Sequence, residues 1–412
     1  MKFFASLFLC LTVTCAYTQQ ADSIVVTIQQ AEEIFLRKNL LLLASRYQVD
    51  AAKANEIQEK LYPNPTFSTD LATYGDNRKW FDIGRRGQKQ FGLDQLIILA
   101  GKRNKRVQLA REQTRETDLA FYDLLRTLKY ELRASFYTQV YATELVTQYT
   151  EQLQWLQQLI NSYEQEANRR NVSLKDAVRL KSEYIQLSAD RNAVMMDALH
   201  AQQTLQLLLD TSVNVMPSKE EWPGRPLPSR EALLETAKKE RADLRMKYSQ
   251  VKQEELNYRL QKAMAIPDVT VGAGYDQDGN YVSNFYSLRA SIDLPLFNRN
   301  QGQIKQAKAQ IRVAELEKDY KELTIEKEIA GSYARLLEAE KEYQLSQTGF
   351  NKDFPAVNRS VIENFNKGNM SMLEFMDFFQ NYNTAIRQVN ELRKQRRLAW
   401  EELEYVTGAS FD

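Results

Sequence analysis

The chain has 412 residues, and its 55 Lys and Arg against 54 Asp and Glu give a formal net charge of +1. This balance gives no support for a nucleic-acid partner, and the interleaved charges are typical of solvated helix faces. The single histidine, His200, lies on a predicted helix without metal-ligand spacing, and no glycine-rich loop precedes a helix to bind phosphate. We therefore expect no enzyme activity, no catalytic residue, no cofactor and no metal site.

The first 16 residues are predicted to be a secretory signal peptide. Lys2 precedes an apolar run, Phe3–Val13, and small residues follow up to Ala16. The run is too short to span a bilayer, and no later run reaches ~18 apolar residues, so an exported protein without a membrane-spanning helix is expected. Cys10 and Cys15 both lie here, so the mature chain should lack disulfides; a lipid anchor on Cys15 stays open as an alternative.

The first half of the mature chain, 17–215, is predicted to place one pair of strands between helices. Helix-forming residues fill 28–60, and this helix should end before Pro63. A period of two then indicates a strand at about 66–74, and a second alternating run at about 88–98 follows a charged loop.

A very long helix is expected at 102–170, because this stretch contains neither proline nor glycine. At 1.5 Å per residue it would extend roughly 100 Å, a length that suits a coiled coil or the wall of a tunnel. Ser173 and Asp176 resemble a capping box, with Asp in place of Glu, so the next helix is expected at 173–210.

The second half, 230–412, repeats this plan after a proline-rich linker at 216–229. The predicted elements are a helix at 230–263, strands at about 267–275 and 285–296, a long helix at 303–367 interrupted near Pro355, and a helix at 371–406 that Ser371 and Glu374 begin with a capping box.

Both strand pairs alternate polar and apolar residues, which is typical of an outer-membrane barrel. Four strands cannot close a barrel alone because open edges are not tolerated in lipid, whereas three copies would supply twelve strands. Two soluble hairpins packed on helices are the alternative. The expected lumen-lining residues are Asp70, Asp94, Arg289 and Asp293, and the expected lipid-facing residues are Phe67, Phe91, Val269, Val271, Tyr275 and Leu288. The predicted fold is thus mostly α with a small β part.

The run from Asp293 to Ile304 resembles the TolC family of outer-membrane efflux proteins, and especially its heavy-metal (CzcC- and CusC-like) branch. Pro63–Pro65 and Ile266–Asp268 resemble the starts of that family's strands. Leu93–Arg103 resembles the exit of its second strand, although Leu96 stands where a proline is common. The resemblance covers nearly the whole mature chain.

This resemblance implies a homotrimer with a shared twelve-stranded barrel in the outer-membrane lipid and an α-helical tunnel in the periplasm. It also implies docking through a periplasmic adaptor (membrane fusion) protein to an energised inner-membrane pump of the RND type. The chain itself would be a passive conduit that exports small molecules or metal ions.

The two Ser-x-x-acid breaks resemble the turns at the periplasmic tips of the family's helical hairpins, so Ser173, Asp176, Ser371 and Glu374 are gate candidates. Asp176 would help form an acidic constriction that attracts cations and holds the resting channel closed. Helix capping is the alternative for both carboxylates, and it is favoured for Glu374. Met370 stands where some relatives have an arginine, which argues against the family's salt-bridged gate in this chain.

Two other classes of protein share some of these features. A structural coiled-coil protein of the cell envelope would explain the export signal and the long helices, but not two strand pairs at equivalent points of two halves. A periplasmic adaptor combines strands with helical hairpins, but it usually has one hairpin where this chain has two. Both alternatives predict solubility without detergent.

Overall fold

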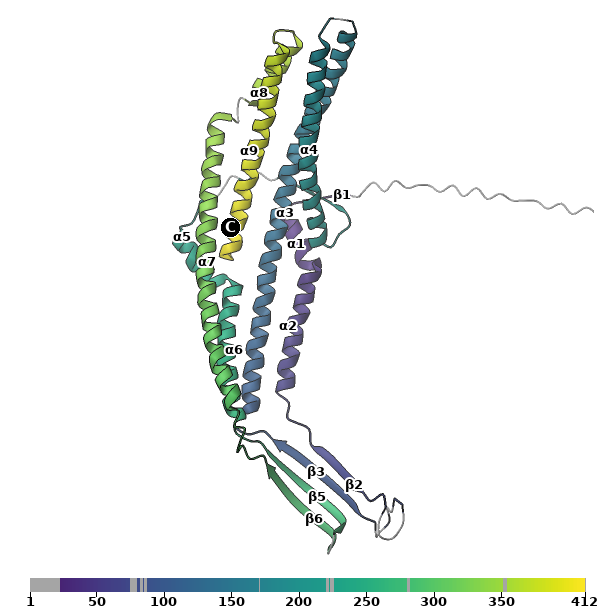
Figure 1. Ribbon diagram of the computed structural model, residues 1–412, viewed down its shortest axis with the longest axis vertical. Helices are drawn as coiled ribbons and strands as arrows, with labels where there is room; N and C mark the ends of the chain where they lie inside the picture. Colours follow the sequence, from purple (N-terminus) through teal and green to yellow (C-terminus); the bar gives the residue numbers. More distant parts are fainter. Residues whose placement is uncertain are drawn as a thin grey trace, which may run out of the picture. The chain divides into compact units, whose positions relative to one another are not determined.

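The computed structural model describes residues 23–74, 80–81, 84, 87–169, 171–219, 222, 226–279, 282–350 and 354–411 (Figure 1). The predicted signal peptide and both cysteines lie outside the described residues. The first half contains β1 (Ser23–Val26), α1 (Ile28–Lys38), α2 (Leu40–Glu59), β2 (Thr66–Leu71), β3 (Lys89–Ile97), α3 (Lys102–Asn168) and α4 (Leu174–Leu208). The second half contains β4 (Asn214–Pro217), α5 (Arg230–Glu240), α6 (Ala242–Met264), β5 (Val269–Gly279), β6 (Val282–Ile292), α7 (Gln301–Phe350), α8 (Phe354–Asn366) and α9 (Met372–Thr407). The second half therefore repeats the order of the first, with α8 added.

The predictions of single helices at 28–60 and 230–263 were wrong, because each helix breaks after its third turn. Asn39 and Arg241 occupy the two breaks with extended backbones, at φ −60°, ψ 119° and φ −64°, ψ 115°. Both side chains are buried. The Asn39 amide donates to the carbonyl of Leu208 at 3.0 Å, and the Arg241 guanidinium donates to the carbonyl of Val406 at 3.0 Å. The two halves therefore repeat this hydrogen bond as well. In each half, the polar side chain at the break donates to a carbonyl at the end of that half's last helix.

A small parallel sheet was missed by the sequence analysis. β1 pairs with β4 from Ser23 opposite Asn214 to Val26 opposite Pro217. The proline-rich linker therefore begins later than residue 216, because Met216 and Pro217 belong to a strand. Four-residue strands carry little periodicity, so their pairing depends on a partner almost two hundred residues away.

The main sheet has the strand order β2-β3-β5-β6, and every neighbouring pair is antiparallel. β5 and β6 extend further toward their connection than predicted, because Gly279 still pairs with Val282. β6 ends at Ile292 rather than at residue 296, because its partner β5 begins at Val269 and leaves the later residues without a strand to bond. β2 likewise ends at Leu71, opposite Lys89.

The helices otherwise follow the prediction within a few residues, apart from the long helix at 303–367. That segment consists of α7 and α8, and α8 begins at Phe354, next to the proline expected to interrupt it. Among the residues that the structure describes, no helix is both long enough and apolar enough to cross a membrane.

The chain forms two compact units that interleave the two halves. Unit 1 contains the described residues of Met1–Asn39, Leu132–Pro223 and Lys352–Lys394, and unit 2 contains those of Leu40–Glu131, Gly224–Asn351 and Gln395–Asp412. The main sheet belongs to unit 2. The core of unit 1 joins α3, α4, α8 and α9, and its fully buried members include Leu156, Leu180 and Phe375.

Candidate functional site

The register of the main sheet separates polar from apolar side chains. Asp70 lies opposite Gln90, which in turn faces Asp276, and Asp94 lies opposite Gly272, which in turn faces Arg289. Because opposed residues of antiparallel strands project to the same side, three predicted lumen residues, Asp70, Asp94 and Arg289, share one face. Asp293 lies one residue beyond the end of β6.

Arg289 crosses this polar face to pair with Asp94 two strands away. Its Nη2 lies 3.2 Å from both carboxylate oxygens of Asp94. Two glycines leave space for these side chains. A Cβ added to Gly92 would lie 2.6 Å from Nη2 of Arg289, and a Cβ added to Gly272 would lie 1.9 Å from Oδ1 of Asp94. The glycines of the polar face therefore make room for a cross-strand ion pair.

The opposite face is mostly apolar, and most of its large apolar side chains are exposed. It carries all six residues predicted to face lipid, namely Phe67, Phe91, Val269, Val271, Tyr275 and Leu288. Leu288 is 91% exposed and Phe67 is 66% exposed. The rings of Phe91 and Tyr275 stack at 6.4 Å, and Tyr286 continues the row at 5.1 Å from Tyr275. An exposed apolar face of this size indicates a surface for lipid or another protein and argues against two soluble hairpins packed on helices.

The turn before α9 closes as predicted. The Ser371 backbone N–H donates to Oε2 of Glu374 at 2.9 Å, and the Glu374 N–H donates to the Ser371 hydroxyl at 3.3 Å. Hydrogen bonds from Ser371 lower the pKa of the Glu374 carboxyl. The backbone N–H has the larger effect and the hydroxyl the smaller one. Glu374 therefore caps its helix, the alternative that the sequence favoured for it.

The turn before α4 differs from the prediction. The Ser173 hydroxyl accepts from the N–H of Lys175 at 3.2 Å, and the carboxylate of Asp176 lies 4.0 Å from Arg179. An aspartate is one methylene shorter than the glutamate that closes a capping box, so its carboxylate turns along the helix instead. Met370 packs against the core of unit 1. The five gate candidates thus lie at two turns, and Asp176 is the one whose carboxylate is not used to cap its helix.

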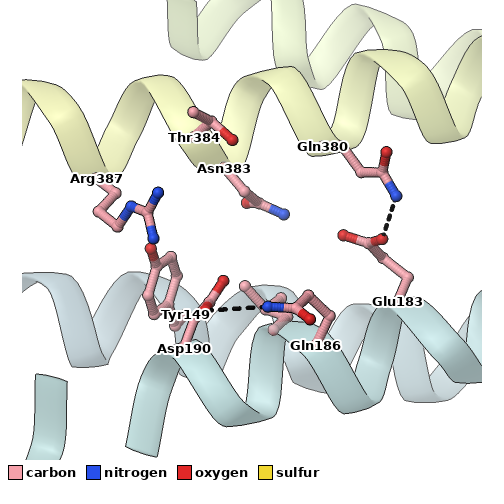
Figure 2. A pocket seen from close by; sticks show the side chains of 9 residues that line it. Tyr149, Glu183, Gln186, Asp190, Gln380, Asn383, Thr384 and Arg387 are labelled. Carbon is pink, nitrogen blue, oxygen red and sulfur yellow. Dashed lines mark hydrogen bonds between the residues drawn. The ribbon is translucent and has the colours of Figure 1, made fainter. Parts of the chain in front are cut away.

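A polar pocket of about 290 Å³ lies between α3, α4 and α9 in unit 1 (Figure 2). Tyr149 comes from α3, Glu183 and Asp190 from α4, and Asn383 and Arg387 from α9. Gln380 donates to Glu183 at 2.7 Å, and Gln186 donates to Asp190 at 3.2 Å. Asn383 is buried, and neither of its amide atoms has a hydrogen-bond partner within the described part of the chain. The pocket thus offers free donors and acceptors to water or to a small polar group.

Burial sets the protonation of two groups in this pocket. Desolvation raises the pKa of the Glu183 carboxyl, with the charge of Asp190 adding to it and the bond from Gln380 opposing it. Desolvation and the charge of Asp190 also raise the pKa of the Tyr149 hydroxyl to about 12, so this hydroxyl stays neutral and able to donate.

The sequence analysis did not select the residues of this pocket, although α4 carries one usable signal. Ala177, Leu180, Glu183 and Leu187 follow each other at spacings of three, three and four, and all four are buried. An acidic residue inside an apolar stripe predicts a buried carboxylate with a polar partner. The residues that the structure describes contain no group of three or more His, Cys, Asp or Glu arranged to hold a metal ion.

Comparison with known proteins relates this chain to outer-membrane efflux proteins. Residues 233–409 match the family model of the outer membrane efflux proteins. The cobalt-zinc-cadmium resistance protein CzcC of Cupriavidus metallidurans is 24% identical over 287 residues, which cover 68% of this chain and 66% of CzcC. The chain is thus similar to the outer membrane efflux proteins, whose family model its second half matches. Its match spans just under two thirds of the length of CzcC, and the predicted resemblance to the TolC family and its CzcC-like branch is confirmed.

Solved structures of efflux channels share the fold of this chain. A structure of CusC gives a TM-score of 0.76 at 16% identity and covers 96% of each chain. The CmeC outer membrane channel of Campylobacter jejuni gives a TM-score of 0.77 at 12% identity and covers 92% of this chain and 85% of CmeC. The predicted fold class, long helices with strands contributed to a barrel, is therefore confirmed.

Proposed function

We propose that this protein is the outer-membrane channel of a tripartite efflux system, a passive conduit from the periplasm to the outside. The observation that carries this proposal is the four-stranded sheet with one polar face, one exposed apolar face and two edge strands, β2 and β6. Such a sheet is stable in lipid only when its edges are paired, and a four-stranded sheet is too small to pair its own edges. Three copies would give a twelve-stranded barrel with the apolar face toward lipid.

The polar face would then line the lumen. Asp70, Asp94 and Arg289 would recur around a three-fold axis, and Asp293 would stand at the end of the lumen where β6 stops. Asp176 would form an acidic ring at the turn between α3 and α4. We choose Asp176 over Glu374 because the carboxylate of Glu374 is already bound into the cap of its own helix. The family match favours this channel over a coiled-coil scaffold or an adaptor.

An inner-membrane pump, reached through a periplasmic adaptor, would supply the energy for transport, because a passive conduit does not drive it. The relative CzcC is a cobalt-zinc-cadmium resistance protein, which supports divalent metal ions as cargo, with other small molecules as the alternative.

The test is the mass, the location and the conductance of the native protein. We expect extraction from the outer membrane only with detergent, a trimer by light scattering, and stepwise conductance in planar bilayers of neutral lipid. A monomer or dimer that is soluble without detergent would overturn the proposal. Cargo is then assigned by comparing the metal tolerance and the drug tolerance of a deletion strain.

A further inference from the structure

Basic residues outnumber acidic residues where the main sheet of unit 2 joins its helices, although the whole chain is nearly neutral. Between Asp94 and Glu112 the sequence contains five basic residues and no acidic one, namely Lys102, Arg103, Lys105, Arg106 and Arg111. Between Asp293 and Glu315 it contains Arg299, Lys305, Lys308 and Arg312, again without an acidic residue. Both segments leave the sheet and begin a long helix, so both halves repeat the same charge pattern.

Four cations of these two segments and two cations near the end of α6 lie where the sheet joins its helices. We call these six residues the basic junction: Arg106, Arg259, Lys262, Arg299, Lys305 and Lys308. The end of α6 is tied to the start of α7, because the Asn300 amide donates to the carbonyl of Gln261 at 2.8 Å. The start of α3 is tied to the start of β5 by Lys102 and Asp268, 2.8 Å apart. At 1.5 Å per residue, the five cations on α3, α6 and α7 lie within roughly 10 Å of the helix end nearest the sheet, and Arg299 lies in the connection between β6 and α7.

The cations of the basic junction are available to an outside partner. Five of the six are exposed, and Arg106 is half-buried. Within the described residues none of the six has a carboxylate within 4 Å, whereas nearby Lys102 is buried against Asp268.

Three exposed apolar side chains lie next to the basic junction in the sequence. Leu294, Leu296 and Phe297 connect β6 to α7, and their side chains are 70%, 67% and 92% exposed. Exposed apolar side chains next to exposed cations are the arrangement found where a protein crosses from acyl chains to lipid head groups.

We propose that the basic junction binds the phosphate groups of anionic phospholipids in the periplasm-facing leaflet of the outer membrane. This proposal rests on the placement of the sheet in that membrane under the proposed function. The junction would fix the depth of the channel in the bilayer, with Phe297 among the acyl chains and the six cations among the phosphates.

The experiment is native mass spectrometry of the detergent-purified trimer titrated with phosphatidylglycerol or with phosphatidylcholine of the same chain length. We expect the unmodified trimer to retain phosphatidylglycerol preferentially. The double variant Lys305→Gln/Lys308→Gln should lower that retention by roughly fivefold for each cation removed from a copy. The matched control is Lys238→Gln/Lys239→Gln, which removes two exposed cations from α5 and should leave retention unchanged.

Three results would overturn the proposal: equal retention of the two lipids by the unmodified trimer, equal loss in the test and control variants, or displacement of the lipid by millimolar inorganic phosphate. The last result would assign the site to free phosphate. The comparison of two lipids on unmodified protein decides the matter even if a variant fails to assemble. A conducting trimer without lipid preference would refute this inference and leave the channel standing.

Discussion

Arg241 shows how one buried residue holds several segments of unit 2 together. Its guanidinium donates to Asp243 at 2.9 and 2.5 Å, to Glu328 at 2.5 Å and to the carbonyl of Val406 at 3.0 Å. Burial by itself would raise the pKa of Asp243, but hydrogen bonds from Arg241 and Lys321 hold the pKa of its carboxyl well below the ordinary value.

Replacing Arg241 by methionine should destabilise the protein strongly. The substitution keeps apolar volume but leaves Asp243 and the Val406 carbonyl without their main donor, at a cost of about 3–5 kcal/mol in the free energy of unfolding. Chemical denaturation of the detergent-purified protein measures this cost. Lys239→Met, on an exposed side chain of α5, is the control and should change stability by less than about 0.5 kcal/mol. Equal midpoints for the two variants would contradict the role given to Arg241.

Glu183 should make stability depend on pH. Its pKa is raised in the folded state, so the folded protein binds the proton more tightly than the unfolded chain does. The stability that this proton contributes is fully present below the ordinary carboxyl pKa and is lost as the pH rises through the raised value. Glu183→Gln keeps an oxygen that can accept from Gln380 and removes the buried charge.

We therefore expect Glu183→Gln to be more stable than the unmodified protein at neutral pH, with the difference disappearing on acidification below the ordinary carboxyl range. Denaturation curves of both proteins across this pH range provide the measurement. Glu231→Gln, on an exposed residue of α5, should show no such dependence. A gain that is constant with pH would point to packing rather than to titration.

At the scale of the element, the main sheet depends on glycines where its polar face is crowded. A methyl group at Gly272 would lie 1.9 Å from Asp94 and 3.0 Å from the carbonyl of Leu93. Asp94 would have to move away, and its ion pair with Arg289 would be lost.

Gly272→Ala should therefore weaken the sheet by about 1–3 kcal/mol and lower the temperature at which the assembled protein dissociates. The matched control is Gly302→Ala near the start of α7, where the new methyl group would meet nothing within 4 Å. The readout is the fraction of intact oligomer after heating, followed on gels. Identical dissociation temperatures for the two variants would show that the contacts around Gly272 do not stabilise the oligomer.

At the scale of the whole molecule, the charges of the polar face should set the ion preference of the assembled channel. Asp70 and Asp276 are placed on the same side of the sheet as Asp94 and Arg289, which leaves that face with more acids than bases. A symmetric assembly repeats each of these charges, so the lumen would favour cations.

The variant Asp70→Asn/Asp276→Asn should shift the reversal potential in a salt gradient toward that of a non-selective pore. The asparagine introduced at position 276 retains an oxygen for the bond that Gln90 now donates to Asp276 at 2.6 Å. Single-channel conductance before and after the change checks that the pore is intact. An unaltered reversal potential would mean that this face is not the surface along which ions pass.

The sequence by itself determined the long helices, the four strands of the main sheet and the two faces of that sheet. Strand alternation depends on adjacent side chains, and the Ser371–Glu374 cap depends on residues three apart, so both can be seen in a short window. The same local information placed the six apolar residues on one face and Asp70, Asp94 and Arg289 on the other. The predicted Ser173–Asp176 box was wrong because one methylene decides whether a carboxylate can reach back.

Only the tertiary structure decided which distant residues meet. The bond between Gln380 and Glu183 joins residues 197 positions apart, and the bond between Arg241 and Val406 joins residues 165 apart. The breaks at Asn39 and Arg241 and the pairing of β1 with β4 have the same origin. No local periodicity specifies such partners, because each contact is fixed by the packing of helices that bring separate segments together.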